Sequence, residues 1–311
     1  MVADRARGLT VFAILTLALV LDAVLGEPRW LWNRIPHPAV LMGRAVTLGD
    51  RWLNRGPVKQ VTGSLLMFVL IAIALGIGLM AQGFGWVIEV VFVAIMLAHK
   101  SLIDHVSAVA DALRLSLGDG RRSVAMIVGR DTRDMNQHTV ARAAIESAAE
   151  NFSDGVVAPA FWYLLGGMPG LLIYKVTNTA DSMIGYRTPR HEAFGWAAAR
   201  FDDLLNLIPA RLTALLFALS FGHLKAWKDI YADARLHRSP NAGWPEAALS
   251  RALGVALSGP RAYDGQMHDL PFVNTFGRRD AGPNDIDRAS QGLWTAWGIG
   301  VAIVLCLVIL V

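Results

Sequence analysis

The densest group of side chains that could do chemistry lies within residues 129–159 (GRDTRDMNQHTVARAAIESAAENFSDGVVAP). Good helix formers over residues 136–150 predict a helix, and Gly155 is suited to its end. The oxygen-bearing side chains near that end are Glu146, Glu150, Asn151 and Asp154. Oxygen ligands clustered in this way suit a hard cation such as Mg²⁺. The plainer alternative is a solvated helix face on which Arg142 pairs with a glutamate.

Two further polar stretches border apolar segments. In residues 174–186 (YKVTNTADSMIGY), Lys175 precedes a helical face formed by Asn178 and Asp181. In the second stretch, residues 200–211, the side chains of interest are Asp202, Asp203 and Arg211. Ionisable groups beside apolar segments are costly unless paired, so they are functional candidates. We expect Lys175 and Arg211 to bind phosphate; the alternative for each is a side chain that snorkels to the lipid headgroups.

Common catalytic motifs are absent from the sequence. There is no Walker A loop, HExxH, CxxC or GxSxG pattern, which argues against P-loop nucleotide binding, zincins, zinc ribbons and the hydrolase elbow. His99 and His105 are six residues apart and do not share a helical face. The single cysteine, Cys306, excludes an internal disulfide.

The elements that must position these side chains are membrane helices. The chain has 311 residues, of which 54% are hydrophobic and only 17% are charged, whereas soluble domains carry about 25% charged residues. A net charge of +4 without a basic run gives no reason to expect nucleic acid as a partner. The composition therefore predicts an all-α polytopic membrane protein, with about four to six membrane segments and large polar helical loops.

The hydropathy pattern places the segments along one integral membrane domain, residues 1–311. Predicted membrane helices cover 8–25, 61–80, 86–98 and 294–311. Two other segments, 156–174 and 207–224, are either full spans or partly inserted re-entrant segments, because one holds Gly-Gly-Met-Pro-Gly and the other holds Arg211. We favour partial insertion for both.

The distribution of charge predicts the orientation. Residues 26–60 hold six Lys and Arg against two acidic residues, which predicts a cytoplasmic loop. The loops expected to form the active site are 99–155, 175–206 and 225–293. Partial insertion of both re-entrant segments keeps all three in the cytoplasm.

Several pieces of the sequence match the motifs of one family. They are Asp22 with Gly26-Glu27-Pro28 and His37-Pro38, GRDT at 129–132, ESAAENFSDGVVAP at 146–159, YKVTNTADSMIGY at 174–186, AARFDDLLNLIPARLTA at 198–214, and SPNAGWPEAALSRALGVALSGP at 239–260. Through these pieces the chain resembles the adenosylcobinamide-phosphate synthase family (CbiB, also called CobD) of cobalamin biosynthesis.

The resemblance implies a carbon–nitrogen ligase of the cell inner membrane. Such an enzyme joins aminopropanol phosphate, or aminopropanol, to the free propionate of adenosylcobyric acid and consumes ATP with Mg²⁺. Its partners would be these substrates, membrane lipid and other enzymes of the pathway. Carried onto this chain, the catalytic residues would be Glu146, Glu150, Asn151, Asp154 and Asp181, with Glu150, Asp154 and Asp181 as metal ligands. The substrate-binding residues would be His37, Arg130, Asp131, Lys175, Asn178, Asp202, Asp203, Arg211 and Asn241.

Two other functions compete with the ligase. A non-catalytic signalling relative of the same family would share the membrane helices, but it would have no need of so many acidic side chains. A transporter could use Asp22 and Glu89 along an ion path, yet the polar loops make up more than half of the chain.

Overall fold

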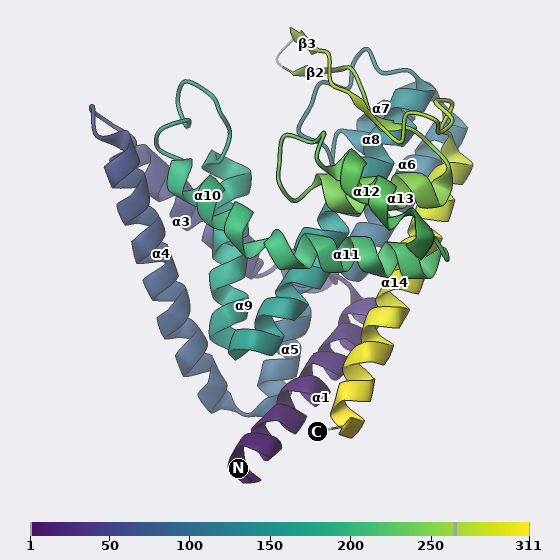
Figure 1. Cartoon of the computed structure of the whole chain (residues 1–311). Coiled ribbons are helices and arrows are strands. Elements are labelled where there is room, and N and C mark those ends of the chain that lie inside the picture. The colour runs from purple at the N-terminus through teal and green to yellow at the C-terminus, as the bar shows by residue number, and fades with distance from the viewer. Residues whose placement is uncertain (1, 264–265, 311) are drawn as a thin grey trace. The chain divides into compact units, whose positions relative to one another are not determined.

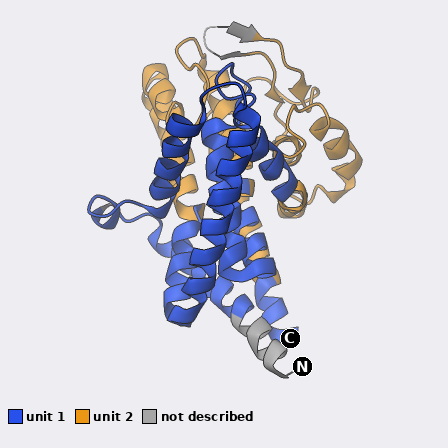
Figure 2. Cartoon of the chain, turned by 90° about the vertical axis from the view of Figure 1, so that its left-hand side faces the viewer, with its two compact units in different colours: residues 1–98, 154–206, 304–311 blue, residues 99–153, 207–303 orange. Residues whose placement is uncertain are grey.

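The computed structural model describes the backbone of residues 2–263 and 266–310, and the side chains of residues 11–28, 30–261 and 268–310. Helices account for 74% of the chain, so the predicted all-α architecture is confirmed (Figure 1). The four strands in the described chain are two or three residues long and form two antiparallel pairs. The chain divides into two compact units, coloured blue and orange in Figure 2.

Unit 1 comprises residues 1–98, 154–206 and 304–311. Its helices are α1 (Val2–Leu25), α2 (Arg29–Trp32), α3 (Pro38–Leu53), α4 (Lys59–Ala81), the 3-10 helix η1 (Gln82–Phe84), α5 (Trp86–Met96), α9 (Ala158–Ile184) and α10 (Trp196–Leu205). The π-helix η2 (Ser153–Val157) lies at the boundary in sequence.

Unit 2 comprises residues 99–153 and 207–303. Its elements are α6 (His99–Leu115), α7 (Leu117–Val124), α8 (Gln137–Phe152), α11 (Leu207–Ser220), the 3-10 helix η3 (Leu224–Ala226), α12 (Trp227–Ala234), α13 (Gly243–Leu253), β1 (Leu257–Ser258), β2 (Arg261–Tyr263), β3 (Gln266–His268) and β4 (Phe272–Val273). Helix α14 (Pro283–Leu310) begins in unit 2, and its last residues belong to unit 1.

Four helical stretches of the described chain are long and apolar enough to cross a membrane: Lys59–Phe84, Trp86–Leu115, Gln137–Ile184 and Pro283–Leu310. Helices α10 and α11, bent by 46°, would make a fifth if they form one span. The predicted spans at 61–80, 86–98 and 294–311 fall within these stretches, except for Val311, which lies outside the described residues. The predicted span at 8–25 lies in α1, whose apolar part, Val11–Leu25, is shorter.

Helix α4 shows what such a stretch exposes. Phe68 and Met80 are 70% and 71% exposed, which would be costly in water for a helix of mean hydropathy 2.6. On its buried side, Gly63 and Gly78 allow close approach to the backbone of Phe194 and Pro169. The helix therefore packs within unit 1 through small residues and leaves an apolar face for lipid.

Helix α9 reverses direction at Gly167. The backbone there has φ 58° and ψ −150°, a conformation that glycine adopts without strain. A Cβ on Gly170 would lie 2.4 Å from the Trp162 carbonyl oxygen, although eight residues of straight helix would rise about 12 Å. The two halves of α9 thus fold back on each other, as Figure 1 shows. That 156–174 is a re-entrant segment in the membrane remains a prediction.

The predicted end of the helix at Gly155 is wrong. Helix α8 begins at Gln137, with the Asn136 side chain accepting the Thr139 N–H at 2.9 Å, and it runs two residues past Glu150. The chain then continues through the five-residue π-helix η2 into α9. Gly155 therefore does not end the helix, and its carbonyl oxygen accepts a hydrogen bond from the Ala98 N–H at 3.1 Å. Wide π-turns inside helices often occur at functional sites.

Candidate functional site

Five polar residues from α9, α10 and the segments beside them meet in unit 1. We call this group the aspartate cluster: Asp154, Tyr174, Asn178, Asp202 and Asn206. The Asn178 amide donates to Asp154 Oδ2 at 3.4 Å and to Asp202 Oδ1 at 3.3 Å. Asn206 donates to Asp202 Oδ2 at 3.0 Å. Asp154 and Asp202, 48 residues apart in sequence, therefore lie within reach of one amide.

The cluster is fixed in place by the π-helix and by a buried tyrosine. The Tyr174 hydroxyl lies 3.0 Å from the Asp154 carbonyl oxygen and 3.1 Å from Asn206 Oδ1. Tyr174 has no exposed surface, and Asp202 and Asn206 are also buried. Buried polar groups that are hydrogen-bonded to one another define a single arrangement. This makes the aspartate cluster a rigid set of oxygen atoms.

Other predicted residues of unit 1 surround this cluster electrostatically. The charges that act on the Lys175 ammonium are those of Asp154, Glu27 and Asp22. Asp181 acts on the Tyr174 hydroxyl, together with the carboxylates of the aspartate cluster. Asp203 instead pairs with Arg200 at 3.4 Å near the surface. Lys175, Asn178 and Asp202 therefore lie close to Asp154, and their predicted role in binding substrate remains a prediction.

A second site forms in unit 2 around the buried carboxylate of Glu146. Arg130 forms an ion pair with Glu146 Oε2, and Arg261 approaches the same oxygen at 3.4 Å. The Ser258 N–H donates to Oε1 at 2.7 Å. Arg142, one helical turn before Glu146, stacks on Phe272 at 5.2 Å and is acted on by the charges of Glu146, Arg130 and Arg261. We call Arg130, Arg142 and Arg261 the arginine cluster.

The backbone of β1 adopts a strained conformation next to Glu146. Ser258 has φ 61°, and Asn274, directly after the pairing strand β4, has φ 54°. They are the two non-glycine residues with positive φ in the described chain. Such conformations cost about 1–3 kcal/mol and persist where the surroundings determine them. At Ser258 the strained backbone turns its N–H toward Glu146.

A histidine and a glutamate lie beside the arginine cluster. Glu246 is 2% exposed, and its Oε2 has no hydrogen-bond partner among the described residues. Burial, together with the charges of Glu146 and Glu150, raises the pKa of Glu246 well above its ordinary value. His237 Nε2 is 3.7 Å from Glu246 Oε1. The Ser239 N–H donates to His237 Nδ1, so the neutral ring carries its proton on Nε2, facing Glu246.

The predicted residues Arg211 and Asn241 meet elsewhere in unit 2. Arg211 stacks over Trp244 at 4.7 Å, and its guanidinium donates to the Leu207 carbonyl at 2.6 Å and to Asn241 Oδ1 at 3.4 Å. The guanidinium is therefore held by an aromatic ring, a carbonyl and an amide. The prediction that it binds phosphate remains a prediction.

His37 caps α3 in unit 1. Its Nδ1 accepts the Ala39 N–H at 3.1 Å, and its Nε2 donates to the Ile95 carbonyl at 3.2 Å. Because Nδ1 accepts a hydrogen bond, the ring is in its neutral form, and burial lowers its pKa. These contacts give His37 a structural role, and its predicted role in binding substrate remains a prediction.

The remaining predicted residues are more open. Glu150 and Asn151 are exposed near the end of α8, where the Asn151 amide donates back to Ser147, and Asp131 is half-buried in the loop before that helix. Within the described part of the chain, no group of three or more His, Cys, Asp or Glu is arranged to hold a metal ion. The proposed metal set of Glu150, Asp154 and Asp181 thus remains a prediction.

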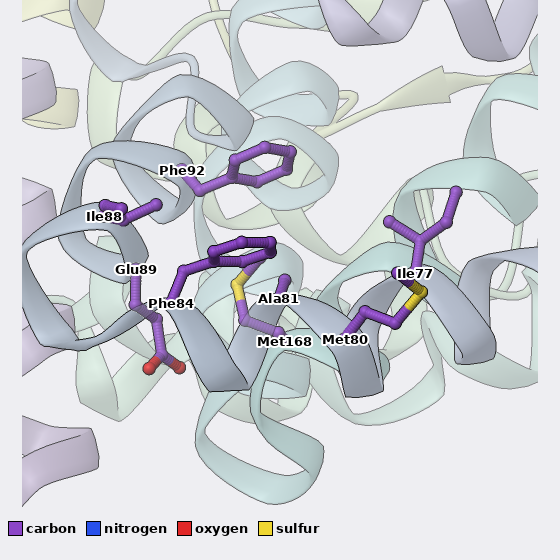
Figure 3. Close-up of a pocket in the computed structure, with 8 residues that line it drawn as sticks. All are labelled: Ile77, Met80, Ala81, Phe84, Ile88, Glu89, Phe92 and Met168. Carbon is purple, nitrogen blue, oxygen red and sulfur yellow. The ribbon is translucent and has the colours of Figure 1, made fainter.

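An apolar pocket of about 330 Å³ lies in unit 1, at the end of α4 and against α5 (Figure 3). Phe84, Phe92 and Met168 gather on one side of it. Glu89 is the ionisable residue in its wall and accepts a hydrogen bond from the Tyr163 hydroxyl at 2.8 Å. The pocket offers no cation for a phosphate, so we do not place the polar chemistry there.

Three residues of the unit 2 site were not singled out by the sequence. Glu246 lies inside the matched piece 239–260, whereas His237 and Arg261 flank that piece. Each lies about 100 residues from Glu146 or Arg130 along the chain. Neither periodicity nor spacing relates these three residues to the GRDT motif. The one sequence feature that could have pointed to them is their position within or beside a matched piece.

Comparison with known proteins places the chain in a biosynthetic family. The model of the family described as CobD/Cbib protein matches residues 15–293. Proteins named "Cobalamin biosynthesis protein CobD" from Brucella suis biovar 1 (strain 1330) and Rhizobium meliloti (strain 1021) are 48% and 49% identical, covering 94% and 93% of this chain and 95% and 94% of the relatives. The protein of that name from Rhodobacter capsulatus is 46% identical, over 84% of this chain and 86% of its own length. No solved structure matches.

Proposed function

The chain belongs to the CobD/Cbib protein family of cobalamin biosynthesis, and from this we propose that it is an ATP-dependent carbon–nitrogen ligase. The reaction joins the amine of aminopropanol phosphate, or of aminopropanol, to the free propionate of adenosylcobyric acid. The product is the amide, adenosylcobinamide phosphate or adenosylcobinamide. The active-site loops face the cytoplasm, where ATP is available.

The observation that carries this proposal is the pairing of two kinds of polar site in one membrane protein. The aspartate cluster brings carboxylates together, and the arginine cluster is cationic. Phosphoryl transfer needs little from a protein beyond positioning and charge neutralisation, by metal-binding carboxylates and by cations. A signalling relative or a transporter would not require both.

The chemistry explains why ATP is needed. A carboxylate at neutral pH has no leaving group, so a propionate oxygen attacks the γ-phosphorus of ATP, and ADP departs. The amine nitrogen then attacks the carbonyl carbon of the acyl phosphate, and inorganic phosphate leaves. The attacking amine must be unprotonated and must lose a proton on forming the amide, so a carboxylate or a neutral histidine acts as base.

The aspartate cluster fits Mg²⁺. Mg²⁺ in phosphoryl-transfer sites is held by one or two carboxylates together with water and substrate phosphates. Asp154 and Asp202 supply two carboxylates that converge on one amide, and they would hold the ion, with Asp181 of the same unit as a further candidate. The bound ion would neutralise phosphate charge on the nucleotide. Asn178 and Asn206 keep the two carboxylates in position.

Reconstitution tests the proposal. The purified chain in lipid nanodiscs is incubated with adenosylcobyric acid, Mg-ATP and either amine, and the product is identified by mass. We expect the amide only when ATP is present. Asp154→Asn should abolish turnover without loss of membrane insertion, whereas Asp104→Asn, which changes an exposed carboxylate paired with Lys100, should not. Absence of product with both amines would contradict the proposal.

A further inference from the structure

The arginine cluster gathers three guanidinium groups around the carboxylate of Glu146. The side chains of Arg130 and Arg261 are each 10% exposed, and that of Glu146 is 4% exposed. Arg142 adds a third guanidinium, held over Phe272. Three guanidinium groups thus lie around one carboxylate in a largely buried place. Guanidinium groups gathered in this way suit an anionic ligand, because each can donate two parallel hydrogen bonds to its oxygen atoms.

A glutamate and a histidine lie beside the three guanidinium groups. Burial, followed by the charges of Glu146 and Glu150, raises the pKa of Glu246 well above its ordinary value, which favours the protonated form of the side chain. Burial, as the largest effect, also lowers the pKa of His237, which favours the neutral ring. In these forms both groups offer hydrogen-bond donors to a ligand.

These donors have unused capacity. Glu246 Oε2 is buried without a partner among the described residues. His237 carries its proton on Nε2, and 3.7 Å to Glu246 Oε1 is too long for a hydrogen bond. A buried polar atom left unpaired costs about 1–3 kcal/mol unless a ligand or water pairs it. The guanidinium groups of the arginine cluster and the side chains of Glu246 and His237 thus lie near one another, and each can still bind a ligand.

We propose that the arginine cluster, with Glu246 and His237, is the binding site for a phosphate group. Guanidinium forks match phosphate oxygens, and a phosphate group has enough oxygen atoms to accept hydrogen bonds from several guanidinium groups at once. The phosphate belongs either to the amine substrate or to the end of the nucleotide. The biological identity of this ligand rests on the proposed function, but the binding itself does not require ligation.

Binding to the purified full chain in nanodiscs of zwitterionic lipid tests the site. Calorimetric titrations use aminopropanol phosphate, aminopropanol, and ATP with EDTA. Aminopropanol phosphate or ATP should bind at least tenfold more tightly than aminopropanol, and the tighter of the two identifies the source of the phosphate. If neither binds more tightly than aminopropanol, the proposal is overturned.

Variants locate the binding. Arg261→Gln should weaken binding of the phosphate probe at least tenfold, and Arg261→Lys should weaken it less. The matched control is Arg122→Gln, because the Arg122 side chain is 75% exposed in the same unit, and it should bind like the wild type. If Arg261→Gln does not fold, Arg142→Gln is the second variant, since the Arg142 side chain stacks on Phe272; severalfold weaker binding is expected. Wild-type affinity in either folded variant would overturn the proposal.

The outcomes also separate this site from the ligase proposal. Probe binding that depends on Arg261, in a chain that forms no amide, would leave the phosphate site standing and remove the ligase. Amide formation with an unchanged KM for the phosphate-bearing substrates in the arginine variants would do the reverse.

Discussion

Glu146→Gln is expected to destabilise the fold severely. The carboxylate is buried between two guanidinium groups and a backbone N–H. Removing one member of a buried ion pair typically costs about 3–5 kcal/mol, because the remaining charge is left uncompensated. Glutamine still accepts the Ser258 N–H, so we expect the lower end, about 3 kcal/mol. Each kcal/mol of lost stability lowers the unfolding temperature by about 2–4 °C, and by the smaller of these values in a chain of this length. The unfolding temperature should therefore fall by roughly 6 °C.

The assay is intrinsic fluorescence of the ten tryptophans during heating in one fixed detergent and at one heating rate. Glu192→Gln is the matched control, since Glu192 is exposed and its loss should change stability by less than about 0.5 kcal/mol. A shift of less than about 1 °C for Glu146→Gln would refute the assignment of Glu146 as the buried counter-ion.

Phosphate gives this prediction a second readout. In Glu146→Gln the guanidinium groups lose their competing carboxylate, so added inorganic phosphate should bind more tightly than in the wild type. The unfolding temperature of the variant should therefore rise more steeply with phosphate concentration. Equal phosphate responses in the two proteins would show that Glu146 and phosphate do not compete for the same cations.

Three further outcomes are expected. Gly167→Ala should lower the unfolding temperature by several degrees, because φ is 58° and the new Cβ would lie 2.8 Å from Gln82 Nε2, whereas Gly166→Ala, with open space, should not. A cysteine at exposed Pro189 in a Cys306→Ser background should react with a membrane-impermeant thiol reagent only from the cytoplasmic side. Burial lowers the pKa of His37 in the folded chain. The unfolded chain therefore binds more protons, and the free energy of unfolding falls as the pH drops below about 6.5. His37→Asn, which can still cap α3, should reduce the fall in unfolding temperature between pH 7.5 and 5.5.

Local features of the fold could be predicted from the sequence. Hydropathy located α4 within two residues at its start and one at its end, because twenty apolar residues admit few alternatives. Helical spacing predicted that Asn178 and Asp181 share one face of a helix, and both lie in α9, three residues apart. These relations depend on residues within a turn or two of one another or on a single helix face.

Relations across the chain could not be predicted. Glycine at position 155 resembles a helix end, but the π-helix carries the chain onward, which depends on partners such as Ala98 and Tyr174. The ion pairs of Glu146 could not be predicted either. Arg142 shares its helical face, yet Arg130 and Arg261 are its ion-pair partners, and Arg261 begins β2, 115 residues further along the chain.

An oxygen-isotope measurement tests the central claim, that ATP activates the propionate, most directly. Adenosylcobyric acid labelled with ¹⁸O in its free propionate is incubated with the purified chain, Mg-ATP and aminopropanol phosphate, and the released phosphate is analysed by mass. The account predicts one ¹⁸O atom in each inorganic phosphate formed, in step with the amide. Amide formed with unlabelled phosphate, or with the label in AMP, would contradict it.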